Sequence, residues 1–339
     1  MRSLRLMRSK AAAIALPMVL AAAIAGCGES TPKRAVDART EVLRFFAVDA
    51  PVVAVLHPEP LADLVALNRA ADGTPAWTSL RGTVLGPLHA AGLGRTQIAR
   101  LVHTNLEIEG VEASALALGA ATSADLAAHR PLLVLATDQT QLLSRLLRHA
   151  AGNGKLRRAG QLHEATLYRS PGASFAARDG VLVSAPRLAD VRTAIKRRDG
   201  DSDQQLDEDV VNSLFNGLGT QGPLLVYADL AGVRKADPGL RTLGRQAPWT
   251  GMLGPTAATF EAVNGALQVE DFSKASGGGF GSADLPIGTA PSRFEISASS
   301  AALLLPPGPI QTLLVGVAPI VGEATASSDE VRLHVTVGR

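Results

Sequence analysis

The sequence predicts an α+β fold: duplicated modules of mainly antiparallel sheet covered by helices. Three observations predict this class. Two similar apolar runs, each opening on a proline, start 172 residues apart at Pro51 and Pro223. Turn signals such as Asn264-Gly265 join stretches of alternating polarity into hairpins. Helical periodicity appears between the strands without the regular strand-helix alternation that a doubly wound parallel sheet requires.

The first 26 residues have the layout of a secretory signal peptide. The first ten carry four basic side chains and no acid, and residues 11–25 are small or apolar, interrupted only by Pro17. The run is too short and too rich in alanine for a membrane span, which needs ~20 predominantly apolar residues. We therefore expect export and removal of this segment.

The four residues that end in the single cysteine resemble the lipobox of bacterial lipoproteins. Ile24-Ala25-Gly26-Cys27 supplies an aliphatic residue, a small residue, glycine and the cysteine in that order. The resemblance implies that Cys27 takes a diacylglyceryl group and becomes the N-terminus after cleavage. The alternative is a free, buried cysteine that acts as a small hydrophobe. Because no second cysteine exists, the exported chain has no disulfide and relies on its core.

Loss of the signal peptide changes the charge of the protein. The whole chain has a formal net charge of +2, and its first ten residues contribute four positive charges, so the mature chain has a charge of −2. A domain that binds nucleic acid carries a basic footprint of its own. The sequence therefore predicts no nucleic-acid partner.

Cleavage before Cys27 leaves 313 residues, enough for about two domains. Residues 27–40 are polar around Pro32 and predict a flexible tether. We expect residues 41–205 to form a first α+β module pair. Residues 206–339 are expected to form a second module that repeats the first and ends in a helix and a strand.

The repeat rests on matched spacing. PVVAVLH from Pro51 and PLLVYAD from Pro223 predict strands that start on proline, and a Trp-Thr pair follows each proline after 26 residues, at 77–78 and 249–250. The same offset relates Arg69 to Arg241 and Gly82 to Gly254. Each copy then reaches a hairpin signal, around Asn264-Gly265 in the second copy and between residues 105–108 and 111–118 in the first.

The segment between the copies predicts a strand, a helix, three strands and a second helix. Residues 131–136 form the first strand, and Asp138 with Gln141 forms a capping-box signature for a helix that ends near Gly152. Strands follow near 165–169, 174–178 and 181–184, and a helix runs from about Pro186 to Arg198.

The rest of the chain predicts a short helix, a loop and a closing strand. The short helix ends before Gly217, and residues 273–292 are glycine-rich and predict a loop or linker. Residues 331–337 predict the last strand. The apolar side of the short helix has four residues: Val210, Val211, Leu214 and Phe215.

The sequence contains no metal site that its spacing supports. Asp199, Asp201 and Asp203 have the opening spacing of a calcium loop, but Gln204 replaces the required glycine and Val210 the bidentate glutamate. A solvated turn that favours the next helix N-terminus is the preferred interpretation. His163 begins a zincin-like HEATL sequence that has no second histidine. The remaining histidines, at 57, 89, 103, 129, 149 and 334, have no metal-ligand spacing.

No catalytic or cofactor-binding motif is present either. Ser30-Thr31-Pro32-Lys33 matches the letters of an S-x-x-K motif, but proline excludes the helix on which that pair works. No nucleophile elbow, no Walker loop and no G-x-G-x-x-G after a strand occurs. We therefore assign no catalytic residue, cofactor or metal and expect a protein that is not an enzyme.

Two further stretches allow a membrane interpretation. Residues 298–322 are uncharged, but four prolines break them, so a core helix at 310–318 is preferred to a second anchor. The second stretch is a basic group that faces either anionic lipid heads or only solvent at a helix end and turn. Its members are Arg145, Arg148, His149, Lys155, Arg157 and Arg158.

Residues 131–209 are similar to a family of exported proteins from high-GC Gram-positive bacteria that is classed only as a domain of unknown function. PLLVLATD, GASFAARDGVLVSAP, the RDGD turn and the repeat at GPLLVYADLAG carry the likeness. It implies an exported, duplicated fold and no activity.

The sequence thus predicts a non-enzymatic lipoprotein at the extracytoplasmic face of the cell membrane. Its expected partners are the membrane, through the lipid, and an unknown protein or apolar ligand. A carrier of lipid or another apolar ligand and an envelope hydrolase whose site is assembled only by folding are the alternatives.

Overall fold

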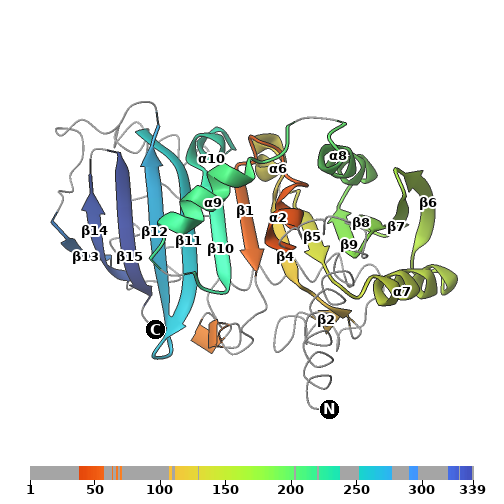
Figure 1. Ribbon diagram of the computed structural model, residues 1–339, viewed down its shortest axis with the longest axis horizontal. Coiled ribbons are helices and arrows are strands. Elements are labelled where there is room, and N and C mark those ends of the chain that lie inside the picture. Colours follow the sequence, from red (N-terminus) through yellow and green to blue (C-terminus); the bar gives the residue numbers. More distant parts are fainter. Residues whose placement is uncertain are drawn as a thin grey trace, which may run out of the picture. The chain divides into compact units, whose positions relative to one another are not determined.

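Thirteen strands join in one antiparallel sheet in the part of the chain that the computed structural model describes (Figure 1). That part comprises residues 38–56, 63, 66–67, 69–70, 107–108, 111–128, 130–201, 204–219, 221–236, 252–276, 290–296, 320–327 and 329–337. All of these residues belong to one compact unit, Ala38–Arg339. The predicted α+β class with a mainly antiparallel sheet is confirmed.

The sheet has the order β13-β14-β15-β12-β11-β10-β1-β4-β5-β9-β8-β7-β6. Its first seven strands in the chain are β1 (Val52–Leu56), β4 (Ala115–Ala120), β5 (Leu132–Ala136), β6 (Arg157–Leu162), β7 (Ala165–Ser170), β8 (Ala173–Arg178) and β9 (Val181–Ala185). The other six are β10 (Leu224–Asp229), β11 (Leu253–Val263), β12 (Ala266–Ala275), β13 (Ser292–Ile296), β14 (Ile320–Ala326) and β15 (Glu330–Val337). A separate small pair consists of β2 (Glu107–Ile108) and β3 (Val111–Glu112). The helices are α2 (Ala38–Leu43), α6 (Ser123–Ala127), α7 (Thr140–Gly152), α8 (Leu188–Arg198), α9 (Glu208–Gly217) and α10 (Leu230–Ala236).

The two strands that open the repeats lie side by side at the middle of the sheet. β1 and β10 pair antiparallel, and Ala54 lies directly opposite Val226. These two residues are related by the same offset of 172 that relates Pro51 to Pro223. On its other edge β1 pairs with β4, which pairs with β5, while β10 pairs with β11, which pairs with β12. The pairing order of the first three strands is therefore the same in both copies.

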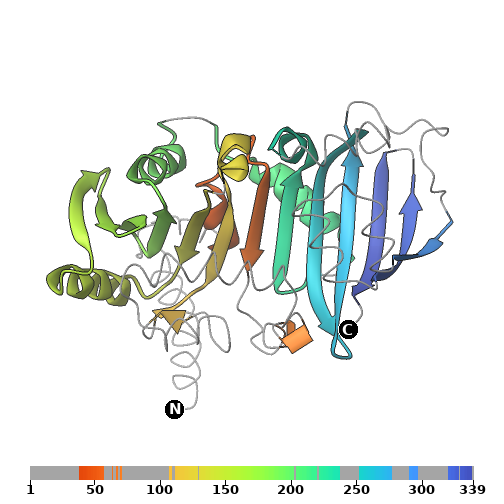
Figure 2. The ribbon, with the colours of Figure 1, turned by 180° about the vertical axis from the view of Figure 1, so that it is seen from behind.

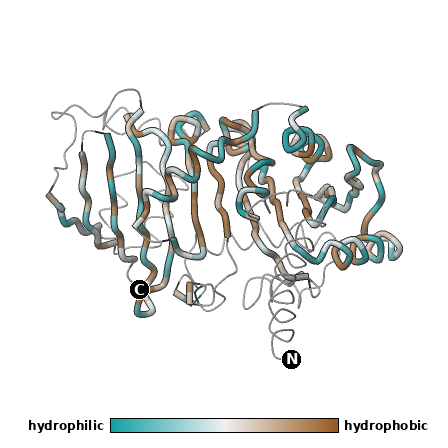
Figure 3. The backbone as a smooth tube through the Cα atoms, viewed as in Figure 1, coloured by the Kyte–Doolittle hydropathy of each residue, from teal (hydrophilic) through white to brown (hydrophobic). Residues whose placement is uncertain are grey.

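Hydrophobic clusters lie on both faces of the sheet, and two of them are the largest. On one face, Val53 and Val55 of β1 join a core that α2, α8 and α9 cover. Figure 1 shows α2 and α9 across this face, and Figure 2 shows the sheet in front of them. On the other face, Leu133 and Leu135 of β5 pack with α7. Because both faces of β5 are covered, all five of its residues are buried. Figure 3 shows hydrophobic residues concentrated along the central strands.

The first core-covering helix after β5 starts later than the sequence indicates. α7 begins at Thr140, and its N-cap is Gln139, whose side chain makes no capping bond, so the prediction that Asp138 caps this helix is wrong. The chain leaves β5 through Thr137, whose N–H donates to the carbonyl of Gly180 at 2.8 Å. The N–H of Gln139 in turn donates to the hydroxyl of Thr137 at 3.1 Å, so Thr137 and Gln139 are tied together just before the helix. A Cβ on Gly180 would lie 2.2 Å from the Thr137 oxygen, so only glycine fits there.

Three other predictions need correction. The first-copy hairpin does not continue to Leu118, because β3 ends at Glu112 and β4 pairs with β1 and β5 instead. Four strands, not three, lie between α7 and α8, since the polar segment RRAGQL forms β6. Val210 is 41% exposed, whereas Val211, Leu214 and Phe215 of α9 are buried as expected. The hairpin at Asn264-Gly265 is confirmed, with φ angles of 52° and 81°.

Several predicted features lie outside the described residues: Cys27, the tether up to residue 37, both Trp-Thr pairs and the expected helix at 310–318. Within the described helices, none combines the length and the apolar character that crossing a membrane demands.

Candidate functional site

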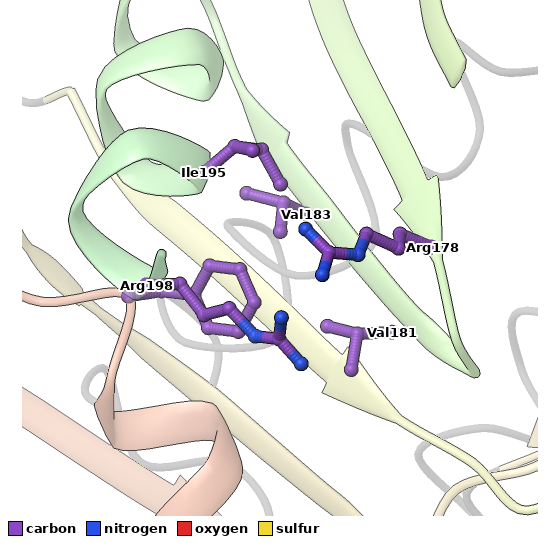
Figure 4. A pocket seen from close by; sticks show the side chains of 6 residues that line it. Arg178, Val181, Val183, Ile195 and Arg198 are labelled. Atoms are coloured by element: carbon purple, nitrogen blue, oxygen red, sulfur yellow. The ribbon is translucent and has the colours of Figure 1, made fainter. Parts of the chain in front are cut away.

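An ion-pair cluster joins β8 to α8 and surrounds a small hollow that described residues line. Arg178 donates from Nη1 to both carboxylate oxygens of Asp199, each at 2.9 Å, and Arg198 Nη1 lies 3.1 Å from Asp199 Oδ1. Figure 4 shows the two arginine side chains extending over Val181 and Val183. The hollow between them is about 10 Å³, which is room for about one water molecule. It is too small for a ligand.

The same cluster continues into α2 and α9. Arg198 Nη2 lies 3.0 Å from Glu41, Arg44 lies 3.7 Å from Glu41, and Arg44 Nε donates to Glu208 at 2.7 Å. Burial lowers the pKa of Arg198, but Glu41 and Asp199 outweigh it, so the pKa is raised above its ordinary value. These charges stabilise the contacts between three helices and the sheet, and each is neutralised by a neighbour.

A larger hollow of about 100 Å³ lies between α6, α8 and the start of β5. Its most buried charged residue is Arg197, which is 1% exposed and donates from Nη1 to the carbonyl of Phe45 at 2.8 Å. The hollow has room for several water molecules. It is smaller than the roughly 300 Å³ at which pockets for small molecules begin.

The carboxylates of this larger hollow are already bonded within the protein. Asp125 accepts from the hydroxyl of Thr122 at 2.8 Å and lies 2.9 Å from Nη2 of Arg130. Asp190 is paired with Arg187. Because each acid has a basic or hydroxyl partner, the arrangement acts as a junction that fixes α6 and α8 beside β5.

A second polar cluster interrupts an apolar stretch of the other sheet face. Thr256 Oγ1 donates to Asp271 Oδ1 at 2.7 Å, and Ser273 Oγ donates to Asp271 Oδ2 at 3.0 Å. Thr256 and Ser273 are buried. Burial raises the pKa of Asp271, and the two hydroxyl bonds oppose this by a smaller amount. The cluster is a carboxyl held by two hydroxyls, without a histidine or second acid within hydrogen-bond reach among the described residues.

The described aspartates and the histidine that the sequence analysis considered as metal ligands form ion pairs in the structure. Asp199 belongs to the arginine cluster above, and Asp201 lies 3.1 Å from Nε2 of His163. His163 and Glu164 form the turn between β6 and β7, with φ angles of 44° and 45°, so HEATL is not helical. Asp203 lies outside the described residues. Within the described part of the chain, no group of three or more His, Cys, Asp or Glu could hold a metal ion.

The basic group is brought together at one end of the sheet. Arg145, Arg148 and His149 are exposed on α7, Lys155 lies in the following turn, and Arg157 and Arg158 begin the edge strand β6. We call these six residues the basic end. It is the candidate site that the sequence predicts, and in the structure its residues lie at the same end of the sheet but on both of its faces, since Arg158 is opposite Tyr168 on the α7 side and Arg157 is opposite Arg169 on the other side.

Sequence reasoning missed Arg197 and Asp271. Arg197 stands in a run of three cations, Lys196-Arg197-Arg198, in which nothing distinguishes the buried one. Asp271 had a usable signal, because it is in phase with Leu267 and Val269, the apolar residues of the same strand. A carboxylate in an apolar register predicts a buried, hydrogen-bonded acid.

Comparisons with known proteins identify no family. No protein-family model and no curated protein matches the sequence. The chain is similar to the solved "Structure of crystal form I of TP0453", with 12% identity and a TM-score of 0.41 over 88% of this chain and 92% of that chain. For crystal form III of TP0453 the identity is 10% and the TM-score 0.41, over 87% and 92%. Likeness at this level supports no inference about function.

Proposed function

We propose that the protein is a lipoprotein that Cys27 anchors at the extracytoplasmic face of the cell membrane, where it binds a partner and catalyses no reaction. One observation carries the proposal: the sequence Ile24-Ala25-Gly26-Cys27 directly follows a basic start and an apolar run. In the anchoring step the thiol loses its proton and forms a thioether with a diacylglyceryl group. A membrane phospholipid donates this group, and its phosphate headgroup leaves with the proton.

Two acyl chains make such an anchor stable. Each buried methylene contributes ~0.8 kcal/mol, and one chain alone gives only marginal, reversible binding. The anchor restricts the protein to the surface of one membrane. Partner binding therefore takes place within reach of the tether.

The two hollows lined by described residues, of about 10 and 100 Å³, are smaller than a typical pocket for a small molecule, and the carboxylates of the larger one are paired. A carrier of an apolar ligand is the alternative to a binding or scaffold role. A lipid recovered from the purified protein by native mass spectrometry would favour the carrier instead.

The anchor is tested by Cys27→Ala together with the mass of the mature protein. The wild-type N-terminal peptide is expected to begin at Cys27 and to carry the diacylglyceryl thioether, and the protein to stay in the membrane fraction after a salt wash. The variant is expected to lack the modification, while Thr31→Ala, a control with an intact lipobox, keeps it. A wild-type chain with a free thiol at Cys27, or one that begins elsewhere, contradicts the proposal.

A further inference from the structure

We propose that the basic end contacts anionic lipid headgroups of the membrane that holds the anchor; this inference rests on the proposed function. Between Asp138 and Asp179 the sequence has seven arginines and lysines and one acid, Glu164. The strands and helices of this segment form the end of the sheet at β6. The described residues at this end of the sheet therefore carry an excess of positive charge, with Arg157 and Arg158 on opposite faces of the sheet and Asp201 lying 3.1 Å from His163 at the β6-β7 turn.

The cations of the basic end form no ion pair among the described residues, and Arg148 Nε donates to the carbonyl of Ser144 at 3.3 Å. The five arginines and lysines of the basic end are exposed, and none lies within 4.0 Å of a carboxylate oxygen in the described part of the chain. Arg178 and Arg198, two cations of the same half of the sheet, each pair with Asp199, whereas Arg169, Arg192 and Lys196 are exposed like the cations of the basic end.

One contact in this region is unfavourable without an external anion. Arg157 of β6 lies directly opposite Arg169 of β7, and both side chains are exposed. Like charges directly opposite each other across a strand pair destabilise a sheet. A row of anionic headgroups would neutralise both arginines at once.

Two structural roles account for only part of the group. Arg148, His149 and Lys155 lie near the C-terminus of α7, where cations complement the helix dipole. Arg157 and Arg158, with the bulge between Arg158 and Gly160, protect the free edge of β6 from pairing with another chain. Neither role explains an unpaired arginine in the middle of α7 at Arg145, nor the Arg157-Arg169 pair.

The charge of the two ends of the sheet differs in sign. The described residues of 252–337, which include β11, β12, β13, β14 and β15 at the opposite end of the sheet, have seven acids and three arginines or lysines. A protein with this asymmetry turns its basic end toward a negative surface. We call the orientation in which the basic end contacts the membrane apposed and the orientation in which it does not released. Each cation near an anionic membrane shifts the ratio of apposed to released molecules by about fivefold.

The proposed anchor keeps this attraction within range. The tether from Cys27 to Ala38 spans 11 residues, so its extended length is at most about 40 Å. Surface charges act over about 8 Å at physiological ionic strength. Rotation of the tethered unit is therefore enough to bring cations into contact with headgroups, and no diffusion from solution is needed.

The test measures how close the basic end lies to the bilayer in acylated protein reconstituted into vesicles. Because acylation consumes the thiol of Cys27, Ser144→Cys on the exposed side of α7 gives a single labelling position, and Val321→Cys on β14, which is 51% exposed, gives the matched control. Energy transfer from each label to acceptor lipids is compared in phosphatidylcholine vesicles and in vesicles that also contain phosphatidylglycerol.

Transfer from position 144 is expected to rise with phosphatidylglycerol, whereas transfer from position 321 does not. The double variant Arg157→Gln, Arg158→Gln should lower the ratio of apposed to released molecules by about 25-fold. The control double variant Arg192→Gln, Lys235→Gln removes exposed cations of α8 and α10 and should leave this ratio unchanged. Salt at about 1 M should abolish the rise, since screening then acts over about 3 Å.

Equal energy transfer from position 144 in both kinds of vesicle overturns the inference. A soluble acidic partner would then be the preferred ligand of the basic end. Failure of the proposed function is distinguished by sedimentation. Protein that does not sediment with either kind of vesicle has no anchor, whereas protein that sediments with both but shows no response to phosphatidylglycerol keeps the anchor and loses the lipid contact.

Discussion

At the scale of single residues, Asp271 has the clearest conflict between its position and its chemistry. Its strand alternates so that Leu267, Val269, Asp271 and Ser273 share one face, and the first two of these belong to a hydrophobic cluster. A charged carboxylate at such a position loses hydration that only Thr256 and Ser273 replace. The folded state therefore favours the protonated form.

The pH dependence of folding follows from this raised pKa. A group whose folded pKa lies above its unfolded pKa, which for Asp is about 3.9, stabilises the fold fully below the unfolded value. That stability is lost as the pH rises through the folded pKa. Asp271→Asn keeps a neutral hydrogen-bonding side chain, so we expect it to unfold at higher urea concentration than wild type at neutral pH.

The comparison at low pH makes the Asp271 prediction specific. The advantage of Asp271→Asn should shrink as the pH falls toward the unfolded value of about 3.9, because the raised pKa lets the folded wild-type carboxyl take up its proton before the unfolded one does. Glu270→Gln, the next residue on the strand but on the opposite face, should leave the Asp271-dependent slope in place. Urea titrations across this pH range measure both, and a constant difference between Asp271→Asn and wild type at every pH would refute the assignment.

At the scale of secondary-structure elements, the arginine cluster holds helices on the sheet. Asp199 at the end of α8 is the acid between Arg178 of β8 and Arg198, and the side chains of all three are less than a quarter exposed. Asp199→Asn would leave two guanidinium groups facing each other. We expect a loss of about 1–3 kcal/mol in the free energy of unfolding, because a partly buried charge pair is broken.

Asp201→Asn is the matched control for Asp199→Asn. Asp201 pairs with His163 at 3.1 Å, but its side chain is 52% exposed, and exposed pairs contribute about 0–1 kcal/mol. The urea midpoint should therefore fall clearly for the Asp199 variant and hardly at all for the Asp201 variant. Equal midpoints for the two variants would mean that the cluster does not stabilise the attachment of α8.

Elements with a strong apolar period were predictable from the sequence, and elements set by tertiary pairing were not. β5, α8 and the Asn264-Gly265 hairpin follow from periodicity and turn chemistry. β6 has the polar sequence RRAGQL and is a strand only because β7 pairs with it, with a bulge after Arg158. The same division applies to the candidate site, since the cations of the basic end are visible in the sequence but their common placement depends on the α7-β6 connection.

At the scale of the whole molecule, the repeat has a structural meaning that spacing alone did not indicate. β1 and β10 pair in a symmetric register, so the two copies meet at their first strands and the sheet continues outward from both. Each copy thus supplies the edge partner of the other. The core on the helical face also crosses this seam, because Val53 and Val55 share it with Leu225 and Tyr227.

The seam predicts that neither copy folds alone as a monomer. A cut between Gln205 and Leu206 divides the chain at the predicted module boundary and leaves β1 and β10 whole. Each fragment then exposes one edge of its first strand, because β1 and β10 have lost each other as partners. Exposed, flat strand edges pair with other chains. We expect residues 38–205 and 206–339 to aggregate or self-associate when expressed separately and to form a one-to-one complex when co-expressed.

Size-exclusion chromatography and hydrogen exchange at β1 and β10 measure this, with slow exchange expected at both strands in the complex alone. Two independently monomeric fragments that unfold cooperatively would show instead that each copy is a self-sufficient domain, because then the pairing of Ala54 with Val226 would add contacts to cores that are already complete.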